Sequence, residues 1–169
     1  MPDHLLYYAY GSNLHPARLA ARIPSSRFLG IALLPNYQLA FHKRGADGSA
    51  KCNALFSGNP EHQLPGALFQ MRAAEKPTLD EIEGLGYRVD TLSVCLAGEM
   101  LSAFAYIAED DYIDPQLKPY HWYKELVYLG ALYHAFPAHL IEQIARVESI
   151  QDEDIERHQK NEQLLTCMR

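Results

Sequence analysis

Apolar residues form short runs over the first two thirds of the chain and helix-like patterns over the last third. Residues 5–10 are continuously apolar and aromatic, which is typical of a buried strand. Gly11-Ser12-Asn13 ends this run with small residues that favour a turn, and a short helix follows over residues 17–22, with Pro16 at its first position. The pattern therefore predicts a strand, a turn and a helix in immediate succession.

Later runs rich in Leu, Ile, Val, Phe and Tyr have strand composition, and turn residues separate them. Pro35-Asn36 interrupts the first of these runs, so it forms either two strands or one bent strand. Ala97-Gly98-Glu99 is the predicted turn of a hairpin. The predicted strands are residues 28–41, 53–56, 65–71, 87–96 and 101–107.

A helix is predicted over residues 73–85, where Leu79, Ile82 and Leu85 recur at three-residue spacing and share one apolar face. Two segments read as loops instead. One is polar and contains glycine, and the other is acidic and carries two prolines, as expected of a loop over a site. These loops span residues 43–49 and 109–119.

The last third of the chain is predicted to be helical over residues 120–133 and 137–147. Residues 151–169 are polar and form either a solvated terminal helix or a frayed tail. Because strands dominate the first two thirds and helices the end, we predict an α+β fold in which a sheet or small β-barrel is flanked by helices. We expect one domain over residues 1–150, followed by the polar segment.

Composition narrows the class of protein. The 169 residues are 48% hydrophobic and 21% charged, which is ordinary for one soluble globular domain. A net charge of −6 argues against nucleic acid as a partner, because phosphate binding needs a basic face. Three widely spaced cysteines, no apparent signal peptide and no long apolar stretch predict a cytoplasmic protein away from the membrane.

The strand–turn–helix start offers the first candidate site. A turn of Gly11, Ser12 and Asn13 before a helix places several backbone N–H groups on one concave surface, and such donors suit an anion. The alternative is a plain turn in which Gly11 supplies only backbone freedom. Both interpretations stay open from local composition.

Glu83 is the candidate acid or base. It lies at the end of the predicted helix 73–85, next to Gly84, where the helix dipole disfavours a carboxylate. Aromatic neighbours such as Tyr87 would raise its pKa by desolvation, which suits proton transfer near neutral pH. The alternative is a solvated helix end, and this is our interpretation of Asp80 and Glu81.

Other chemistry is weakly supported. The eight histidines form no metal-binding spacing, so no metal is expected. Ser12 has no neighbouring base and is a poor candidate nucleophile. Cys52 and Cys95 lie in apolar strands and are predicted to be buried core residues. Tyr123 remains of interest because it follows the proline-containing loop.

Three motifs occur in order along the chain. They are Tyr10-Gly11-Ser12-Asn13-Leu14, Leu79-Asp80-Glu81-Ile82-Glu83-Gly84, and Tyr123-Lys124 followed by Leu129-Gly130-Ala131. Together they resemble the γ-glutamylcyclotransferase family, including its plant-type and γ-glutamylamine branches. The resemblance extends over roughly residues 5–147, and the glutathione-specific branch is less similar because it differs after the Tyr-Gly-Ser sequence. One departure is the short interval of two residues between Gly84 and Tyr87.

The resemblance implies a small β-barrel with helices outside and a pocket at one mouth. It implies that the loop after the first strand holds the charged end of a γ-glutamyl group, that Glu83 is the general acid/base, and that no cofactor takes part. The substrate-binding residues that it implies are Tyr8, Ala9, Tyr10, Gly11, Ser12, Asn13, Leu14, Tyr87 and Tyr123.

The predicted function is a cofactor-free carbon–nitrogen lyase that acts on a small γ-glutamyl substrate. The α-amine of the substrate attacks its own γ-carbonyl and releases 5-oxoproline and an amine or amino acid, so the protein needs no nucleophile. Two alternatives stay open: a non-catalytic binder of a γ-glutamyl or carboxylate metabolite on the same fold, and a dimerising scaffold that uses the late helices. A homodimer is compatible with the enzyme as well.

Overall fold

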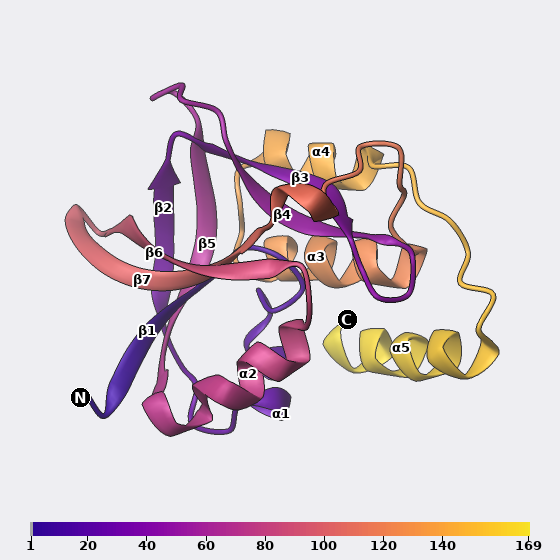
Figure 1. Cartoon of the computed structure of the whole chain (residues 1–169), viewed down its shortest axis with the longest axis horizontal. Helices are drawn as coiled ribbons and strands as arrows, with labels where there is room; N and C mark the ends of the chain where they lie inside the picture. The colour runs from indigo at the N-terminus through magenta and orange to yellow at the C-terminus, as the bar shows by residue number, and fades with distance from the viewer. Residues whose placement is uncertain (1) are drawn as a thin grey trace.

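Five strands close into a barrel in a computed structural model that describes residues 2–169 (Figure 1). The remaining two strands form a separate antiparallel pair, so the predicted α+β fold with a small barrel is confirmed. The barrel order is β1 (His4–Ala9), β5 (Gln63–Arg72), β2 (Arg27–Pro35), β6 (Tyr87–Leu96) and β7 (Glu99–Ala108), and the separate pair is β3 (Tyr37–Arg44) and β4 (Ala50–Phe56).

Strand β1 is central to the barrel because it pairs with strands on both sides. It runs antiparallel to β5 along its whole length, with Tyr8 opposite Leu68. On its other side Tyr7 pairs in parallel with Phe104 of β7, and this contact closes the barrel. The loop that follows β1 is therefore held at one end of the barrel.

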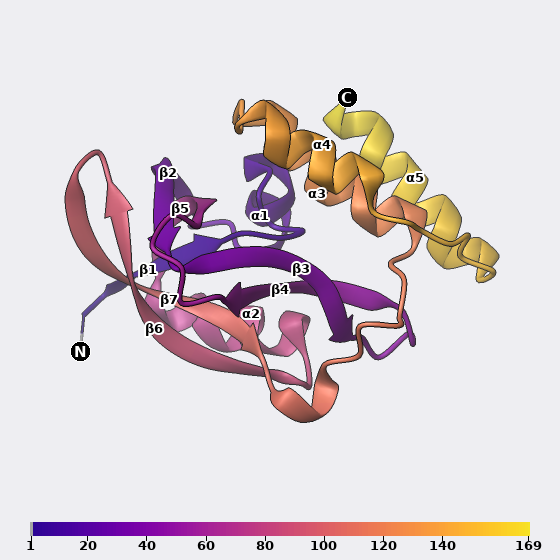
Figure 2. The ribbon, with the colours of Figure 1, turned by 90° about the horizontal axis from the view of Figure 1, so that it is seen from above.

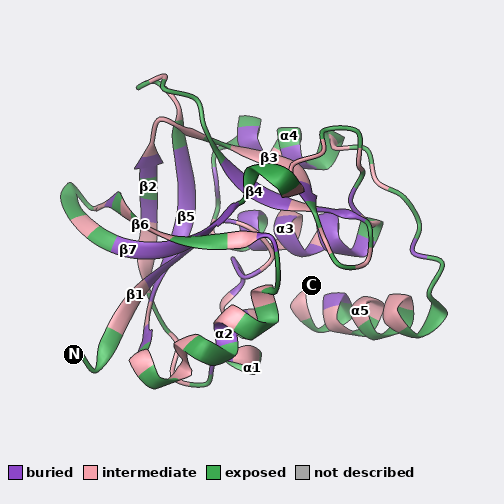
Figure 3. Cartoon of the chain, viewed as in Figure 1, coloured by how far each residue is buried: buried purple, intermediate pink, exposed green. Residues whose placement is uncertain are grey.

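Helices cover the barrel and the β3–β4 pair. Figure 2 shows that α3, α4 and α5 gather on one side of the molecule, and Figure 3 shows buried positions along β5, β7 and α3. None of the helices within residues 2–169 combines the length and apolar character needed to span a membrane. The helices are α1 (Pro16–Arg22), α2 (Lys76–Glu83), α3 (His121–Tyr133), α4 (Ala138–Arg146) and α5 (Ile155–Met168), with short 3₁₀ turns η1 (Ala73–Glu75) and η2 (Asp110–Tyr112).

The predicted helix over residues 73–85 is shorter than expected. It starts as the turn η1, and α2 ends at Glu83 because Gly84 adopts a positive φ of 73°. Leu79 is fully buried, but Ile82 is 39% exposed and Leu85 is 84% exposed. The prediction that these three residues share one apolar helix face was wrong, since Leu85 lies beyond the helix end.

One strand also extends into a segment predicted as a loop. Strand β3 continues to Arg44, so the polar loop spans residues 45–49, and β4 begins at Ala50, three residues earlier than the predicted strand 53–56. The run over residues 28–41 does divide at Asn36, which has a φ of 71°. This division gives the two-strand alternative that the sequence left open.

The C-terminal segment is a docked helix rather than a frayed tail. Leu165 of α5 is fully buried. Ahead of the helix, the buried carboxylate of Asp152 accepts hydrogen bonds from Trp122 Nε1 at 2.9 Å and from Arg157 Nε at 2.6 Å. A buried carboxylate with two donors is satisfied, so this contact fastens α5 to α3.

We expect Leu165→Ala to reduce the free energy of unfolding by about 2–5 kcal/mol, because it leaves a cavity beneath α5. Leu85→Ala is the control, since an 84% exposed side chain should contribute within about 0.5 kcal/mol. Urea denaturation of the two variants would measure the difference. Equal stability of both variants would show that α5 is not part of the cooperative fold.

Candidate functional site

A small cavity lies where the loop after β1 meets the end of α2. Its volume is about 30 Å³, close to the space of one water molecule, so a bound metabolite must extend beyond it or displace lining side chains. Segments far apart in the sequence meet here. The lining residues are Tyr7, Tyr10, Gly11, Ser12, Asn13, Cys52, Glu83, Tyr87, Tyr106 and Tyr123.

Asn13 joins the two sides of this cavity. Its Nδ2 donates to Glu83 Oε1 at 2.9 Å and to the Tyr7 hydroxyl at 3.2 Å, which uses both of its N–H groups. Its Oδ1 accepts from Arg22 Nη1 at 3.1 Å. The Asn13 side chain is only 2% exposed, and both ends of its amide are hydrogen-bonded. Asn13 therefore fixes the position of the Glu83 carboxylate.

Burial raises the pKa of Glu83 above its usual range. The positive charges of Arg22, Arg18 and Lys43 and the hydrogen bond from Asn13 act in the opposite direction, in that order of strength. Desolvation is therefore partly offset by three cations. A carboxylate in this balance accepts and returns a proton more readily near neutral pH than an exposed one.

Lys43 holds the segment that follows Glu83. Its Nζ donates to the Leu85 carbonyl at 2.7 Å and lies 4.3 Å from the ring centre of Tyr87, and the residue is only 2% exposed. A side chain at Gly86, which has a φ of 92°, would collide with Tyr112 and with Lys43. The turn after α2 is thus tied to β3.

Two tyrosines hold the peptide of Cys52 on the opposite wall. The Tyr87 hydroxyl donates to the Cys52 carbonyl at 2.5 Å, and the Cys52 N–H donates to the Tyr123 hydroxyl at 3.0 Å. Burial raises the pKa of the Cys52 thiol to about 12, so the thiol stays protonated at neutral pH. Burial also raises the pKa of Tyr87 and Tyr123, and both remain neutral.

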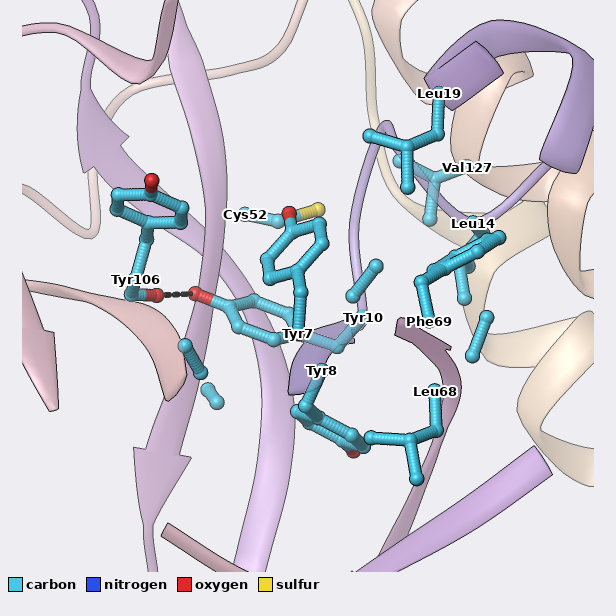
Figure 4. Packing of buried hydrophobic residues seen from close by; sticks show 14 of the residues in the cluster. Tyr7, Tyr8, Tyr10, Leu14, Leu19, Cys52, Leu68, Phe69, Tyr106 and Val127 are labelled. Carbon is cyan, nitrogen blue, oxygen red and sulfur yellow. Dashed lines mark hydrogen bonds between the residues drawn. The ribbon is translucent and has the colours of Figure 1, made fainter. Parts of the chain in front are cut away.

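The structure brings most of the sequence-predicted site residues to this cavity, but not all of them. Tyr8, Ala9 and Leu14 lie outside its lining. Figure 4 shows the ring of Tyr8 beside Leu68, and its hydroxyl donates to the Leu64 carbonyl at 2.7 Å. Leu14 is fully buried against Gly130 of α3. These three residues support the ends of the loop. Those that line the cavity are Tyr10, Gly11, Ser12, Asn13, Glu83, Tyr87 and Tyr123.

Sequence reasoning missed other parts of the site. Alternation along β1 places Tyr7 on the cavity side and Tyr8 on the other, which a continuously apolar run did not reveal. Arg18 and Arg22 are four residues apart, so their shared helix face was a readable pattern. Cys52 is buried as expected, yet it also lines the cavity. Tyr106 and Lys43 carried no local sign of their role.

Metal binding has no support from the geometry. Across residues 2–169, no three side chains of His, Cys, Asp or Glu come together in a way that could hold an ion. The ionisable side chains that line the cavity are one carboxylate, one thiol and five tyrosines.

The chain that forms this cavity is similar in sequence to proteins of a known family. Residues 7–125 match the family model described as gamma-glutamyl cyclotransferase, AIG2-like. Human gamma-glutamylcyclotransferase is 27% identical over 153 residues, which cover 86% of this chain and 80% of the human protein.

Two solved structures share the fold. One, described as gamma-glutamyl cyclotransferase, superposes with a TM-score of 0.81 at 22% identity and covers 97% of this chain and 99% of its own. The other is an uncharacterized protein from Homo sapiens, with a TM-score of 0.80 at 23% identity and coverage of 98% and 99%. At these identities the superpositions show the fold alone.

We expect the Glu83 carboxyl to titrate at a higher pH than a glutamate side chain in water, because burial disfavours its charged form. Lys43→Met should raise the Glu83 midpoint further, by up to about one pH unit, since a nearby positive charge is removed. Carbon-13 NMR of the glutamate side chains would measure both, with Glu83→Gln assigning the resonance.

Lys118→Met is the matched control, because Lys118 forms an exposed surface pair with Glu148. It should leave the Glu83 midpoint unchanged. A Glu83 midpoint at or below the ordinary value of a glutamate side chain would contradict the desolvated setting described above.

Proposed function

This chain belongs to the gamma-glutamyl cyclotransferase, AIG2-like family, and we propose that it releases 5-oxoproline from a γ-glutamyl amide or amine, with Glu83 as the general acid/base. The observation that carries the proposal is the hydrogen bond between Asn13 and Glu83, which sets a carboxylate of raised pKa against the Gly11–Asn13 loop. The two motifs thus face each other across one cavity.

The loop is suited to hold the charged end of the substrate. The backbone N–H groups of Ser12 and Asn13 donate to no acceptor within residues 2–169, and Gly11 and Ser12 line the cavity. Unpaired N–H groups beside a cavity attract a carboxylate or a developing oxyanion. Holding the γ-glutamyl chain folded brings its α-amine to its γ-carbonyl and supplies much of the rate acceleration through proximity.

In the first step the α-amine nitrogen forms a bond to the γ-carbonyl carbon, and Glu83 accepts a proton from that nitrogen. The carbonyl electron pair moves to oxygen, which gives a tetrahedral oxyanion. A glutamate with a raised pKa accepts a proton from an amine more readily than a glutamate with an ordinary pKa does, because the two pKa values are closer. Tyr7, Tyr10 and Tyr123 line the cavity and are buried, so they limit the access of water to the reacting atoms.

In the second step the tetrahedral species collapses. The bond from the γ-carbon to the leaving nitrogen breaks, and Glu83 returns its proton to that nitrogen. The products are the five-membered lactam 5-oxoproline and an amine or amino acid, so water is not consumed and Glu83 is again ionised. One carboxylate therefore serves both steps.

No side chain needs to attack the substrate in this sequence. The thiol of Cys52, with a pKa of about 12, is not ionised at neutral pH. Within residues 2–169, the Ser12 hydroxyl forms no hydrogen bond with a side chain that could act as its base. The proposal thus assigns nucleophilic attack to the substrate amine.

The test is release of 5-oxoproline from γ-glutamyl-alanine and γ-glutamyl-lysine by the wild type and by Glu83→Gln. We expect Glu83→Gln to lower kcat about a hundred-fold or more, because it removes the proton acceptor while keeping the shape of the side chain. Glu81→Gln, on the same helix but exposed, is the matched control and should keep wild-type activity.

Equal activity of Glu83→Gln and the wild type would overturn the role of Glu83. Binding of 5-oxoproline by calorimetry, without turnover of a broad γ-glutamyl panel, would instead identify the chain as a non-catalytic binder on the same fold.

A further inference from the structure

Arg18 lies on the helix face that points toward the Asn13–Glu83 pair. It is four residues before Arg22 in α1, so the two side chains leave the helix on the same side. Arg22 donates to Asn13, and Asn13 donates to Glu83. Arg22 is thus engaged with the loop, whereas Arg18 forms no side-chain hydrogen bond within residues 2–169.

The Nε atom of Arg18 is an orphan donor. Among the side chains of residues 2–169 it is the one buried nitrogen or oxygen without a hydrogen-bond partner. Leaving such a donor unpaired is costly, and folded proteins rarely do so without a reason. Arg18 does not itself line the cavity, but it lies near Glu83 and Tyr123, which do, and an acceptor that arrives with a ligand would satisfy its open donor.

The charges around Arg18 favour an anion. Burial and, to a smaller extent, the neighbouring charge of Arg22 lower the pKa of Arg18 to about 10, although Tyr123 and Glu83 act in the opposite direction. Arg18 is therefore charged at neutral pH, close to two residues that line the cavity. An anion bound here would relieve the repulsion between the two guanidinium groups and satisfy the open donor.

We propose that Arg18 binds the α-carboxylate of the γ-glutamyl group through its Nε–H and one Nη–H. This inference rests on the proposed function, in which the α-amine must reach Glu83. The α-carboxylate is attached to the same carbon as that amine, so it too must lie near Glu83. Arg18 is the cation there whose donors are not already occupied by the protein. In this arrangement the Nε–H and one Nη–H of the guanidinium point in parallel, and each donates to one of the two carboxylate oxygens.

This assignment makes Arg18 a specificity-determining residue. The α-carboxylate is untouched by ring closure and survives in 5-oxoproline. A substrate or product in which it is replaced by a carboxamide keeps its size but loses the negative charge and one acceptor. Recognition by Arg18 can therefore be measured by equilibrium binding, independently of turnover.

The experiment is calorimetric binding of 5-oxoproline and of 5-oxoprolinamide to the wild type, Arg18→Met and Arg18→Lys. The wild type should bind the acid about 10- to 100-fold more tightly than the amide, as expected for a charge-assisted hydrogen bond. Arg18→Met should bring this ratio close to one by weakening the acid, and Arg18→Lys should give an intermediate ratio. Arg146→Met, at an 80% exposed surface arginine, is the control and should keep the wild-type ratio.

An acid-to-amide ratio in Arg18→Met equal to that of the wild type would overturn the proposal, as would a wild type that binds neither compound. If Arg18→Met does not fold, the ratio in Arg18→Lys decides in the same way. Turnover by the wild type with a ratio insensitive to Arg18 would remove this inference and leave the proposed reaction intact. A ratio that depends on Arg18, in a protein that does not turn over γ-glutamyl substrates, would support this inference and remove the proposed reaction.

Discussion

The hydrogen bond between Asn13 and Glu83 is the constraint on which the rest of the site depends. It joins residues 70 positions apart, one in the loop after β1 and one at the last turn of α2. The barrel supplies the frame, since pairing of β1 with β5 and β7 fixes the loop, and the turn held by Lys43 fixes the helix end. Without that frame Glu83 would be a solvated residue at a helix terminus.

Much of the fold was predictable because local patterns of apolar and polar residues determine it. The strand at residues 5–10, the glycine-containing turn after it and the late helices all follow from composition and periodicity. The end of α2 was harder to place, because apolar spacing continued through Leu85 while the backbone had already turned at Gly84. The conformational freedom of one glycine outweighed the periodic pattern.

The site was predictable only in its two motifs. The order of the motifs pointed to the loop and to Glu83. The contacts that set their positions and charges come from segments distant in the sequence. Lys43 on β3 and Arg18 on α1 influence Glu83 through space, and the Cys52 peptide is held by tyrosines from β6 and α3. Likewise, the docking of α5 depends on the contacts of the buried Asp152 carboxylate with Trp122 and Arg157, and no apolar pattern marks them. Polar contacts between distant residues leave no local periodicity to detect.

The partly buried, desolvated setting of Glu83 has a consequence for how this chain can evolve. A carboxyl whose folded-state pKa is raised lowers folding stability at pH values above that pKa, and the loss disappears only below its unfolded value. An uncharged residue at this position would therefore give a more stable protein at neutral pH. Under the proposed function, selection for turnover keeps the glutamate, so a lineage released from that selection would lose Glu83 first and would retain the loop.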